Sequence, residues 1–276
     1  MEGSPVAWED VGLNGTPATQ YNRGMGPEER VTGGVGEGPV DVSRRIVAGA
    51  SRFAVLTGAG ISAESGLATF RGPDGLWEGH RVEDVATPEA FARDPELVWR
   101  FYNARRKAAR TAEPNAGHLA LARLEASGRR VRVLTQNVDG LHQRAGSRKV
   151  TELHGSLWRV RCAVCGETTT EQPLELPILP YCSYCKGLLR PDIVWFGEML
   201  DPADLYAAER ALTECEVFLV IGTSAQVQPA ASFAFLAAER GKSVIEVNTQ
   251  ATPLSGAVTL SLIGPAGEIL PRLVPG

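Results

Sequence analysis

Residues 53–66, FAVLTGAGISAESG, predict the element on which the rest of the fold is built. The apolar run at 53–57 indicates a buried strand, and the glycines after it indicate a turn into a helix. Residues 58–63, GAGISA, fit G-x-G-x-x-A, in which backbone amides at a helix N-terminus approach a pyrophosphate. The pattern is weak alone. The acidic residue usual about 20 positions later is missing, and a loop, LATFRGPDGLWEGH at 67–80, follows instead.

Five more apolar, β-branched runs follow along the chain, and amphipathic stretches with helical spacing separate several of them. Strands that alternate with helices indicate an α/β protein with a parallel sheet covered by helices on both faces. The helical stretches lie at 95–111, 115–127 and 229–240, and the apolar runs at 131–135, 150–153, 217–222, 243–247 and 258–262.

Polar residues stand at the ends of most of these predicted strands. TQNVDG follows 131–135, HGS follows 150–153, GTS occupies 222–224 and VNTQ occupies 247–250. A polar residue at one strand end is most often a turn residue or a helix cap. Ligands of open α/β sheets bind beyond the carboxyl ends of the strands, so several such ends at one edge predict a binding site.

Four of the five cysteines form two Cys-x-x-Cys pairs, CAVC and CSYC, separated by sixteen residues. This spacing predicts one Zn²⁺ bound by four thiolates, which leave no coordination position for water and so favour a structural metal. A redox function is the weaker alternative, because neither pair opens a helix after a strand. The surrounding segment, about 155–198, has little periodicity and indicates a small zinc-binding domain held together by the metal. The predicted ligands are Cys162, Cys165, Cys182 and Cys185, and the fifth cysteine, Cys215, is expected to be a buried, inert thiol.

His154 precedes the first cysteine pair, but the four thiolates complete the zinc coordination without it. A histidine at a strand end is either a core residue hydrogen-bonded to a backbone carbonyl or a residue with a chemical function. The position alone does not choose between these two interpretations.

The composition excludes several classes of protein. The net charge of −4 gives no basic footprint, so no direct nucleic-acid binding is expected. No apolar run approaches the roughly 20 residues of a membrane span, so no membrane partner is expected. The N-terminus lacks the basic start and apolar stretch of a signal peptide, which predicts a cytoplasmic protein. Residues 1–40 carry many Gly, Pro, Asn and Thr without periodicity and are predicted to be a disordered extension.

Taken together, the motifs resemble those of the sirtuin family of NAD-dependent protein lysine deacylases. They occur in the family's order over about residues 43 to 274: GAGISAESG, TFRG, TQNVDGLH, ELHGS, the two Cys-x-x-Cys pairs, PDIVWFGE, GTS and VN. The resemblance implies a catalytic domain at 41–276. Within it we expect a Rossmann-like part at 43–70, 115–154 and 199–276, a helical insertion at about 71–114 and the zinc-binding insertion at about 155–198.

The chemistry that this resemblance implies uses NAD as a co-substrate and acyl-lysine proteins as substrates. The acyl oxygen attacks C1′ of the nicotinamide ribose, nicotinamide leaves, and the histidine of an HG motif activates a ribose hydroxyl. The products are free lysine and O-acyl-ADP-ribose. His154 matches that histidine, and an imidazole titrates near operating pH, as a general base should. By this resemblance His154 is the catalytic base and Asn137 a second catalytic residue.

Further residues match binding positions of the family. Two positions depart from its pattern: Gln250 stands where many relatives have an acidic residue, and Gln228 where tyrosine is common. The first puts the adenosine contacts in doubt, and the second affects the peptide side more than catalysis. The residues implied to bind substrate peptide by strand pairing are Val194, Phe196, Gly197, Glu198 and Val227. Those implied to bind NAD are Gly58, Ala59, Gly60, Ser62, Phe70, Arg71, Gln136, Asn137, Asp139, Gly222, Thr223, Ser224, Asn248 and Ala266.

Tyr102 and Arg105 stand three residues apart in the helix predicted at 95–111, so they share a face. A tyrosine hydroxyl and a guanidinium that converge can bind a carboxylate. The alternative is a solvated basic face, because three more basic residues follow. Y-x-x-R resembles the signature of the class III branch, which removes succinyl, malonyl and glutaryl groups, and the small Ala86 fits a wider acyl pocket. The resemblance therefore implies a deacylase of both acetyl- and succinyl-lysine.

Two alternative functions use the same motifs. Protein mono-ADP-ribosylation needs only a different nucleophile at C1′, and an inactive NAD-binding sensor needs no turnover at all. The intact set of His154, Asn137 and Asp139 argues for deacylation over both.

Overall fold

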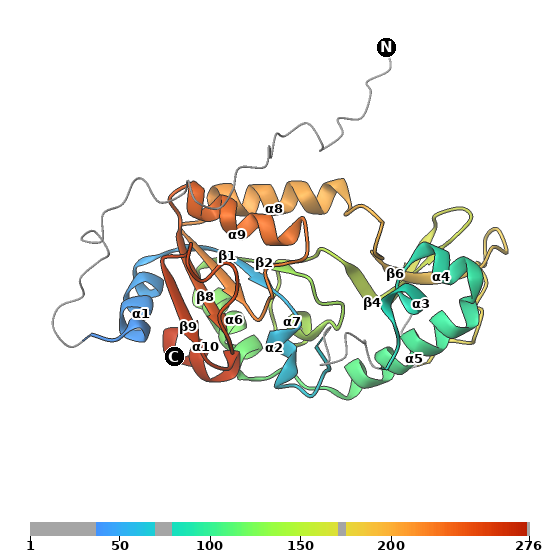
Figure 1. The fold of residues 1–276 in the computed structure, drawn as a ribbon, viewed down its shortest axis with the longest axis horizontal. Coiled ribbons are helices and arrows are strands. Elements are labelled where there is room, and N and C mark those ends of the chain that lie inside the picture. Colours follow the sequence, from blue (N-terminus) through green and yellow to red (C-terminus); the bar gives the residue numbers. More distant parts are fainter. Residues whose placement is uncertain (1–36, 70–78, 171–174, 275–276) are drawn as a thin grey trace, which may run out of the picture. The chain divides into compact units, whose positions relative to one another are not determined.

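The computed structural model describes residues 37–69, 79–170 and 175–274 of the chain. Gly38–Gly276 form one compact unit, whose helices and strands are drawn in Figure 1. The first helix, α1 (Pro39–Gly49), begins with proline, which is favoured there because the first amide of a helix has no intrahelical acceptor. This helix takes in the last two residues that the sequence assigned to the N-terminal extension. Phe70 and Arg71, both predicted to bind NAD, lie outside the described residues.

A parallel sheet of six strands forms the centre of the unit, in the order β3-β2-β1-β7-β8-β9. This is the Rossmann order, two sets of three strands wound in opposite directions from the middle, and it confirms the predicted fold class. The point where the order reverses lies between β1 and β7, which is where such folds bind their ligands. The strands are β1 (Arg52–Thr57), β2 (Arg130–Thr135), β3 (Val150–Glu152), β7 (Val217–Ile221), β8 (Ser243–Asn248) and β9 (Leu260–Ile263).

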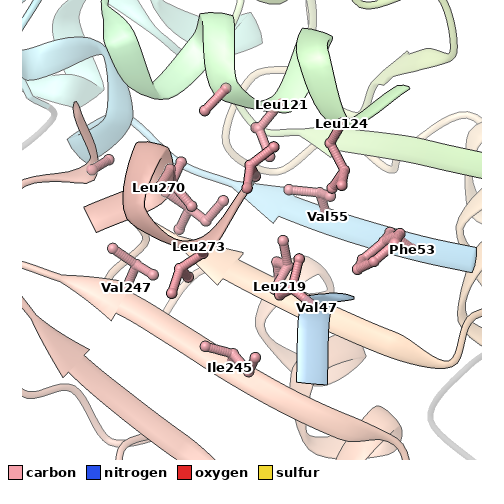
Figure 2. Packing of buried hydrophobic residues seen from close by; sticks show 14 of the residues in the cluster. Val47, Phe53, Val55, Leu121, Leu124, Leu219, Ile245, Val247, Leu270 and Leu273 are labelled. Atoms are coloured by element: carbon pink, nitrogen blue, oxygen red, sulfur yellow. The ribbon is translucent and has the colours of Figure 1, made fainter. Parts of the chain in front are cut away.

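Helices cover both faces of this sheet, because the strands are apolar on both sides. In β1, Phe53 and Val55 enter one hydrophobic cluster, whereas Ala54 and Leu56 enter another on the opposite face. The first cluster is closed by α1, α6 (Ala116–Ala126) and α10 (Ala266–Leu273), and Figure 2 shows leucines of α6 and α10 packed over β1, β7 and β8. The second is closed by α8 (Pro202–Glu214) and α9 (Ala230–Glu239), which lie together on the other side in Figure 1.

A smaller antiparallel sheet, in the order β5-β4-β6, extends from one end of the unit. It consists of β4 (Gly155–Cys162), β5 (Thr168–Thr170) and β6 (Leu189–Ile193). Three helices pack against it in a third hydrophobic cluster: α3 (Val82–Val85), α4 (Pro88–Arg93) and α5 (Pro95–Thr111). Two short helices, α2 (Gly60–Ala63) and α7 (Leu141–Arg144), follow β1 and β2 and lie at the edge of the large sheet.

The described helices are too short or too polar for any of them to cross a membrane.

Candidate functional site

The site forms where the ends of four parallel strands meet. The register pairs Thr57 of β1 with Thr135 of β2 and with Ile221 of β7, so the loops after these strands start side by side. The Gly58 amide donates to the Ile221 carbonyl at 3.0 Å, and the Gln136 amide donates to the Thr57 carbonyl at 2.9 Å. The predicted polar strand ends are therefore brought to one edge of the sheet.

The glycine turn after β1 packs directly against the glycine after β7. The Gly60 amide donates to the Gly222 carbonyl at 2.8 Å. A Cβ on Gly60 would lie 2.7 Å from backbone atoms of Gly222, and one on Gly222 would lie 2.3 Å from the Ile61 nitrogen. Gly222 also has a φ of 60°, in the left-handed region that favours glycine. Two backbones thus approach at the crossover point in a way that only glycine permits.

A buried hydrogen-bond network joins this turn to the loop after β2. The Asn137 side-chain amide donates to the Gly58 carbonyl and to the Ser62 hydroxyl, both at 3.1 Å. Ser62 in turn donates to Asp139 Oδ2 at 2.7 Å, and the Leu141 amide donates to Asp139 Oδ1 at 2.9 Å. Burial raises the pKa of Asp139, while the Leu141 and Ser62 hydrogen bonds oppose that rise. Three predicted site residues therefore hold one another in fixed positions.

Two buried histidines lie below this network, and sequence reasoning did not assign a function to either. His142 Nε2 lies 2.9 Å from the Thr57 hydroxyl, which donates to the Thr135 hydroxyl at 2.8 Å. The Asn137 backbone amide donates to Thr135 at 3.0 Å, so this chain supports the Asn137 loop from beneath. The His118 ring contacts the His142 ring with centroids 4.9 Å apart and planes tilted by 59°. The only available signal was the histidine that ends TQNVDGLH.

The two buried histidines predict a pH-dependent stability. Burial lowers the pKa of His118 to about 4 and that of His142 to about 3, whereas unfolded histidines titrate near 6.5. The stability gained by keeping each histidine neutral is therefore fully present above pH 6.5. It is lost as the pH falls toward the pKa of that histidine in the folded protein. His118→Leu should remove one of these two contributions. The difference in free energy of unfolding, variant minus wild type, should then rise by up to about 1.4 kcal/mol for each pH unit below 6.5. Urea unfolding at several pH values measures this, and parallel curves for the two proteins would contradict it.

His154 lies between the large and small sheets, at the turn from β3 into β4. Its Nδ1 lies 3.2 Å from the Gln136 carbonyl. A carbonyl oxygen only accepts, so Nδ1 carries the proton and Nε2 keeps its lone pair in the neutral ring. Burial lowers the pKa of the imidazole, although the Gln136 hydrogen bond opposes that effect. The ring is therefore neutral at physiological pH, with its basic nitrogen directed away from Gln136.

The loops after β7 and β8 form the remaining side of the site. Gln136 Nε2 donates to the Thr223 hydroxyl at 3.0 Å, and the Asn248 amide donates to the Thr223 carbonyl at 2.8 Å. Ser224 is exposed beside them. Ala266 starts α10 and packs against Gly117, where an added Cβ would meet Ala266 backbone at 3.2 Å. The predicted residues on this side thus surround the ends of β7 and β8.

The segment after β6 joins His154 to the small helices. The Val194 amide donates to the His154 carbonyl, and the Phe196 amide donates to the Ala86 carbonyl, each at 3.0 Å. The Glu198 carboxylate accepts hydrogen bonds from both terminal guanidinium nitrogens of Arg190, at 2.6 and 2.8 Å. Gly197, which lies between Phe196 and Glu198 in the chain, has a φ of 86°. Val227, the other residue predicted to contact peptide, is half-buried in the loop between β7 and α9.

Tyr102 and Arg105 do not belong to a solvated basic face. Tyr102 is 1% exposed, and its hydroxyl accepts from the Trp195 indole N–H at 2.9 Å. Arg105, one turn further along α5, is half-buried, and its charge lowers the pKa values of both Tyr102 and Asp139 against the effect of burial. Arg106 is also buried and donates to the Leu157 carbonyl. Of the three basic residues that favoured a solvated face, only Lys107 and Arg110 are exposed.

The four predicted zinc ligands converge in the small sheet. Their sulfur atoms all lie within 4.8 Å of one another, with Cys162 and Cys185 at 3.4 Å and Cys165 and Cys182 at 3.9 Å. A tetrahedron with Zn–S bonds of about 2.3 Å requires sulfurs about 3.8 Å apart. Backbone amides of Val164 and Gly187 point at two of the sulfurs, as expected for thiolates. The four side chains therefore fit a structural Zn²⁺, and no histidine is needed.

The fold and site define a nucleotide-binding α/β protein with a zinc-binding module. The Sir2 family model matches residues 58–229. NAD-dependent protein deacylase 2 of Pyrobaculum aerophilum is 52% identical over 230 residues, which are 83% of this chain and 92% of that protein. Mitochondrial NAD-dependent protein deacylase sirtuin-5 of Danio rerio is 46% identical over 255 residues, with 83% of this chain and 84% of that protein covered. The chain belongs to the Sir2 family.

Solved structures agree with this assignment. A Sir2 homologue in complex with NAD superposes with a TM-score of 0.79 at 48% identity, covering 84% of this chain and 91% of that one.

Proposed function

We propose that this chain is an NAD-dependent protein-lysine deacylase that removes acetyl and succinyl groups, and malonyl groups by the same chemistry. NAD is its co-substrate, and one structural Zn²⁺ is bound by the four cysteines. The observation that carries the proposal is the pairing of a neutral His154, whose Nε2 is free to accept a proton, with the Asn137, Ser62 and Asp139 network at the same sheet edge. A general base of this kind must be neutral and unprotonated to act.

The residues present fit NAD at the switch point of the sheet. NAD supplies an electrophilic ribose carbon once nicotinamide has left. Gly58, Gly60 and Gly222 let the turns after β1 and β7 pack closely at this point, because a side chain on any of them would collide with its neighbour. Asn137 and Asp139 hold the nicotinamide end, and Nε2 of His154 takes a proton from a ribose hydroxyl. The proposed NAD set also comprises Ala59, Ser62, Phe70, Arg71, Gln136, Thr223, Ser224, Asn248 and Ala266.

Acyl-lysine proteins are the proposed substrates, bound by the segment that follows β6. Val194 and Phe196 lie two residues apart in this segment. The Val194 amide donates to the His154 carbonyl, and the Phe196 amide donates to the Ala86 carbonyl. An extended substrate segment can add to this stretch as a strand. The lysine it carries would then enter between His154 and the third hydrophobic cluster. Gly197, Glu198 and Val227 complete the proposed contacts.

The domain layout expected from the motifs remains our assignment: a catalytic domain from 41, with the helical insertion at about 71–114 and the zinc-binding insertion at about 155–198. A reducing compartment such as the cytoplasm suits the four thiolates that the zinc site needs. The proposed partners are acyl-lysine proteins, with no nucleic acid among them.

Turnover on acylated peptides tests the proposed function. The protein with NAD and an acetyl-lysine or succinyl-lysine peptide should release nicotinamide, free lysine and O-acyl-ADP-ribose, measured together by mass spectrometry. An ADP-ribosyltransferase would label the peptide or protein instead, and a sensor would bind NAD without releasing nicotinamide. Neither alternative is favoured, since the chain has both a candidate base and a candidate peptide-binding segment.

Acyl selectivity is tested at Arg105. Arg105→Met should lower kcat/KM for the succinyl peptide by roughly 10- to 100-fold, the worth of a hydrogen bond to a charged group. The acetyl peptide should change little, because it has no carboxylate. Arg100→Met is the matched control on the same helix, because Arg100 is exposed and its ion-pair partner is the equally exposed Glu96, at 3.2 Å. Equal effects on both peptides would show that Arg105 does not bind the acyl carboxylate.

A further inference from the structure

Trp195 connects the segment proposed to bind peptide with the residues proposed to bind the acyl carboxylate. Its side chain is 2% exposed and packs in the third hydrophobic cluster. The indole N–H donates to the Tyr102 hydroxyl at 2.9 Å, with ring centroids 6.4 Å apart and the planes tilted. The contact joins residues 93 positions apart in the chain.

This contact decides where the Tyr102 proton can point. The hydroxyl hydrogen of a phenol prefers the plane of the ring, which gives it two positions on opposite sides of the oxygen. The incoming N–H of Trp195 occupies one side, so the Tyr102 proton is directed to the other. Within the described part of the chain no residue accepts that proton. Burial raises the pKa of Tyr102 to about 12, which keeps the hydroxyl protonated at physiological pH.

Trp195 is itself held on two sides. The Arg190 guanidinium lies 3.4 Å from the centre of the indole ring, and Arg190 donates twice to Glu198. The Trp195 backbone amide donates to the same Glu198 carboxylate at 2.8 Å. Charge-assisted hydrogen bonds and a cation–π contact therefore fix both the backbone and the ring of Trp195.

We propose that Trp195 determines acyl selectivity by orienting the Tyr102 hydroxyl so that it donates its proton to the carboxylate of a succinyl- or malonyl-lysine. The inference rests on the proposed function and adds a residue to its selectivity. Trp195 is a positioning residue, because it acts through Tyr102 and does not bind the carboxylate itself. An acetyl group presents no carboxylate, so deacetylation does not use this hydrogen bond.

The test is the ratio of kcat/KM for succinyl and acetyl forms of one peptide. Trp195→Phe keeps an aromatic ring and removes the N–H, and the ratio should fall roughly three- to tenfold. Trp99→Phe is the matched control. Trp99 is fully buried in the same cluster, and its N–H donates to the Leu189 carbonyl at 2.9 Å instead of a tyrosine. Its loss should affect both substrates alike.

A cycle with Tyr102→Phe separates orientation from general loosening. In the Tyr102→Phe background, Trp195→Phe should change the ratio no further, because no hydroxyl remains to be oriented. If Trp195→Phe does not fold, a benzothiophene analogue of Trp195, with sulfur in place of the N–H, gives the same comparison in an intact core. An unchanged ratio, or an equal fall with and without the Tyr102 hydroxyl, overturns the inference. A wild type that deacetylates but shows no desuccinylation rejects the proposed acyl range first, and the inference with it.

Discussion

Replacement of His154 by asparagine is expected to lower kcat for deacylation by about 10²- to 10⁴-fold, the usual contribution of a general base. Asparagine can still donate a hydrogen bond to the Gln136 carbonyl, so the local fold should survive. It offers no basic nitrogen in place of Nε2. The measurement is steady-state turnover on an acetyl-lysine peptide, with the thermal midpoint recorded to establish that the variant is folded.

The comparison variant is His118→Asn, which removes a fully buried histidine that contacts His142 and lies outside the predicted site. It should lower stability and leave kcat within a few-fold of the wild type. Nicotinamide release and exchange should also fall less than deacylation in His154→Asn, because in the chemistry proposed for this site the base acts after nicotinamide has left. Equal loss of both reactions would mean that His154 serves binding and not proton transfer.

The pH profile of kcat/KM gives a second readout for His154. Because burial lowers the pKa of the imidazole below 6.5, the neutral form of the ring predominates as the pH falls from 8 to 6.5. Activity should therefore fall to half of its plateau only below pH 6.5, as the base becomes protonated. An acid limb with its midpoint above pH 6.5 would contradict the burial that the structure gives to His154.

Removal of the metal is expected to abolish activity as completely as loss of the base. Cys162 ends β4, Cys165 follows it, and Cys182 and Cys185 precede β6. Val194, whose amide bonds to the His154 carbonyl, comes directly after β6. Without Zn²⁺ the two Cys-x-x-Cys segments lose the metal that joins all four thiolates, and structural zinc supplies about 10–16 kcal/mol of apparent binding energy to small domains. Cys185→Ser, or a strong chelator, should yield protein with substoichiometric zinc, a lower thermal midpoint and no measurable deacylation.

Cys215→Ser is the matched control for the cysteine variant. Cys215 is buried at the end of α8, with its sulfur 3.3 Å from the Leu212 carbonyl, and it lies outside the cluster. This variant should keep one zinc per chain by atomic absorption and retain activity. Full activity of the metal-free protein would show that the small sheet folds and positions Val194 without zinc.

Local sequence patterns were sufficient to predict several parts of the molecule. The run at 53–57 and the glycines after it predicted β1 and its turn, and the alternation of strands and helices predicted the covered parallel sheet. The cysteine spacing predicted which four side chains meet. In each case neighbouring residues hold the information, either as a periodicity or as a short turn.

The course of α5 shows where such patterns stop being informative. The sequence PELVWRFYNARRKAART predicted the helix at the bounds the structure has. It did not predict that Arg106 would be buried on the Leu157 carbonyl while Lys107, next to it, remains exposed. Tyr102 and Arg105 could be identified as a carboxylate pair only by resemblance, since the burial of one and half-burial of the other depend on β4 and β6.

By itself the sequence determined a parallel sheet covered by helices, the glycine turn after β1, the zinc ligands and, through resemblance, the Sir2 motifs. Only the tertiary structure decided which nitrogen of His154 is basic, that His118 contacts His142, and that Trp195 donates to Tyr102. The reason is physical. The first set follows from residue patterns and spacings that recur along the chain, whereas each contact in the second is made by packing of side chains 18 to 93 positions apart that no such pattern marks. Burial and hydrogen-bond direction at those contacts are set by the packed partner.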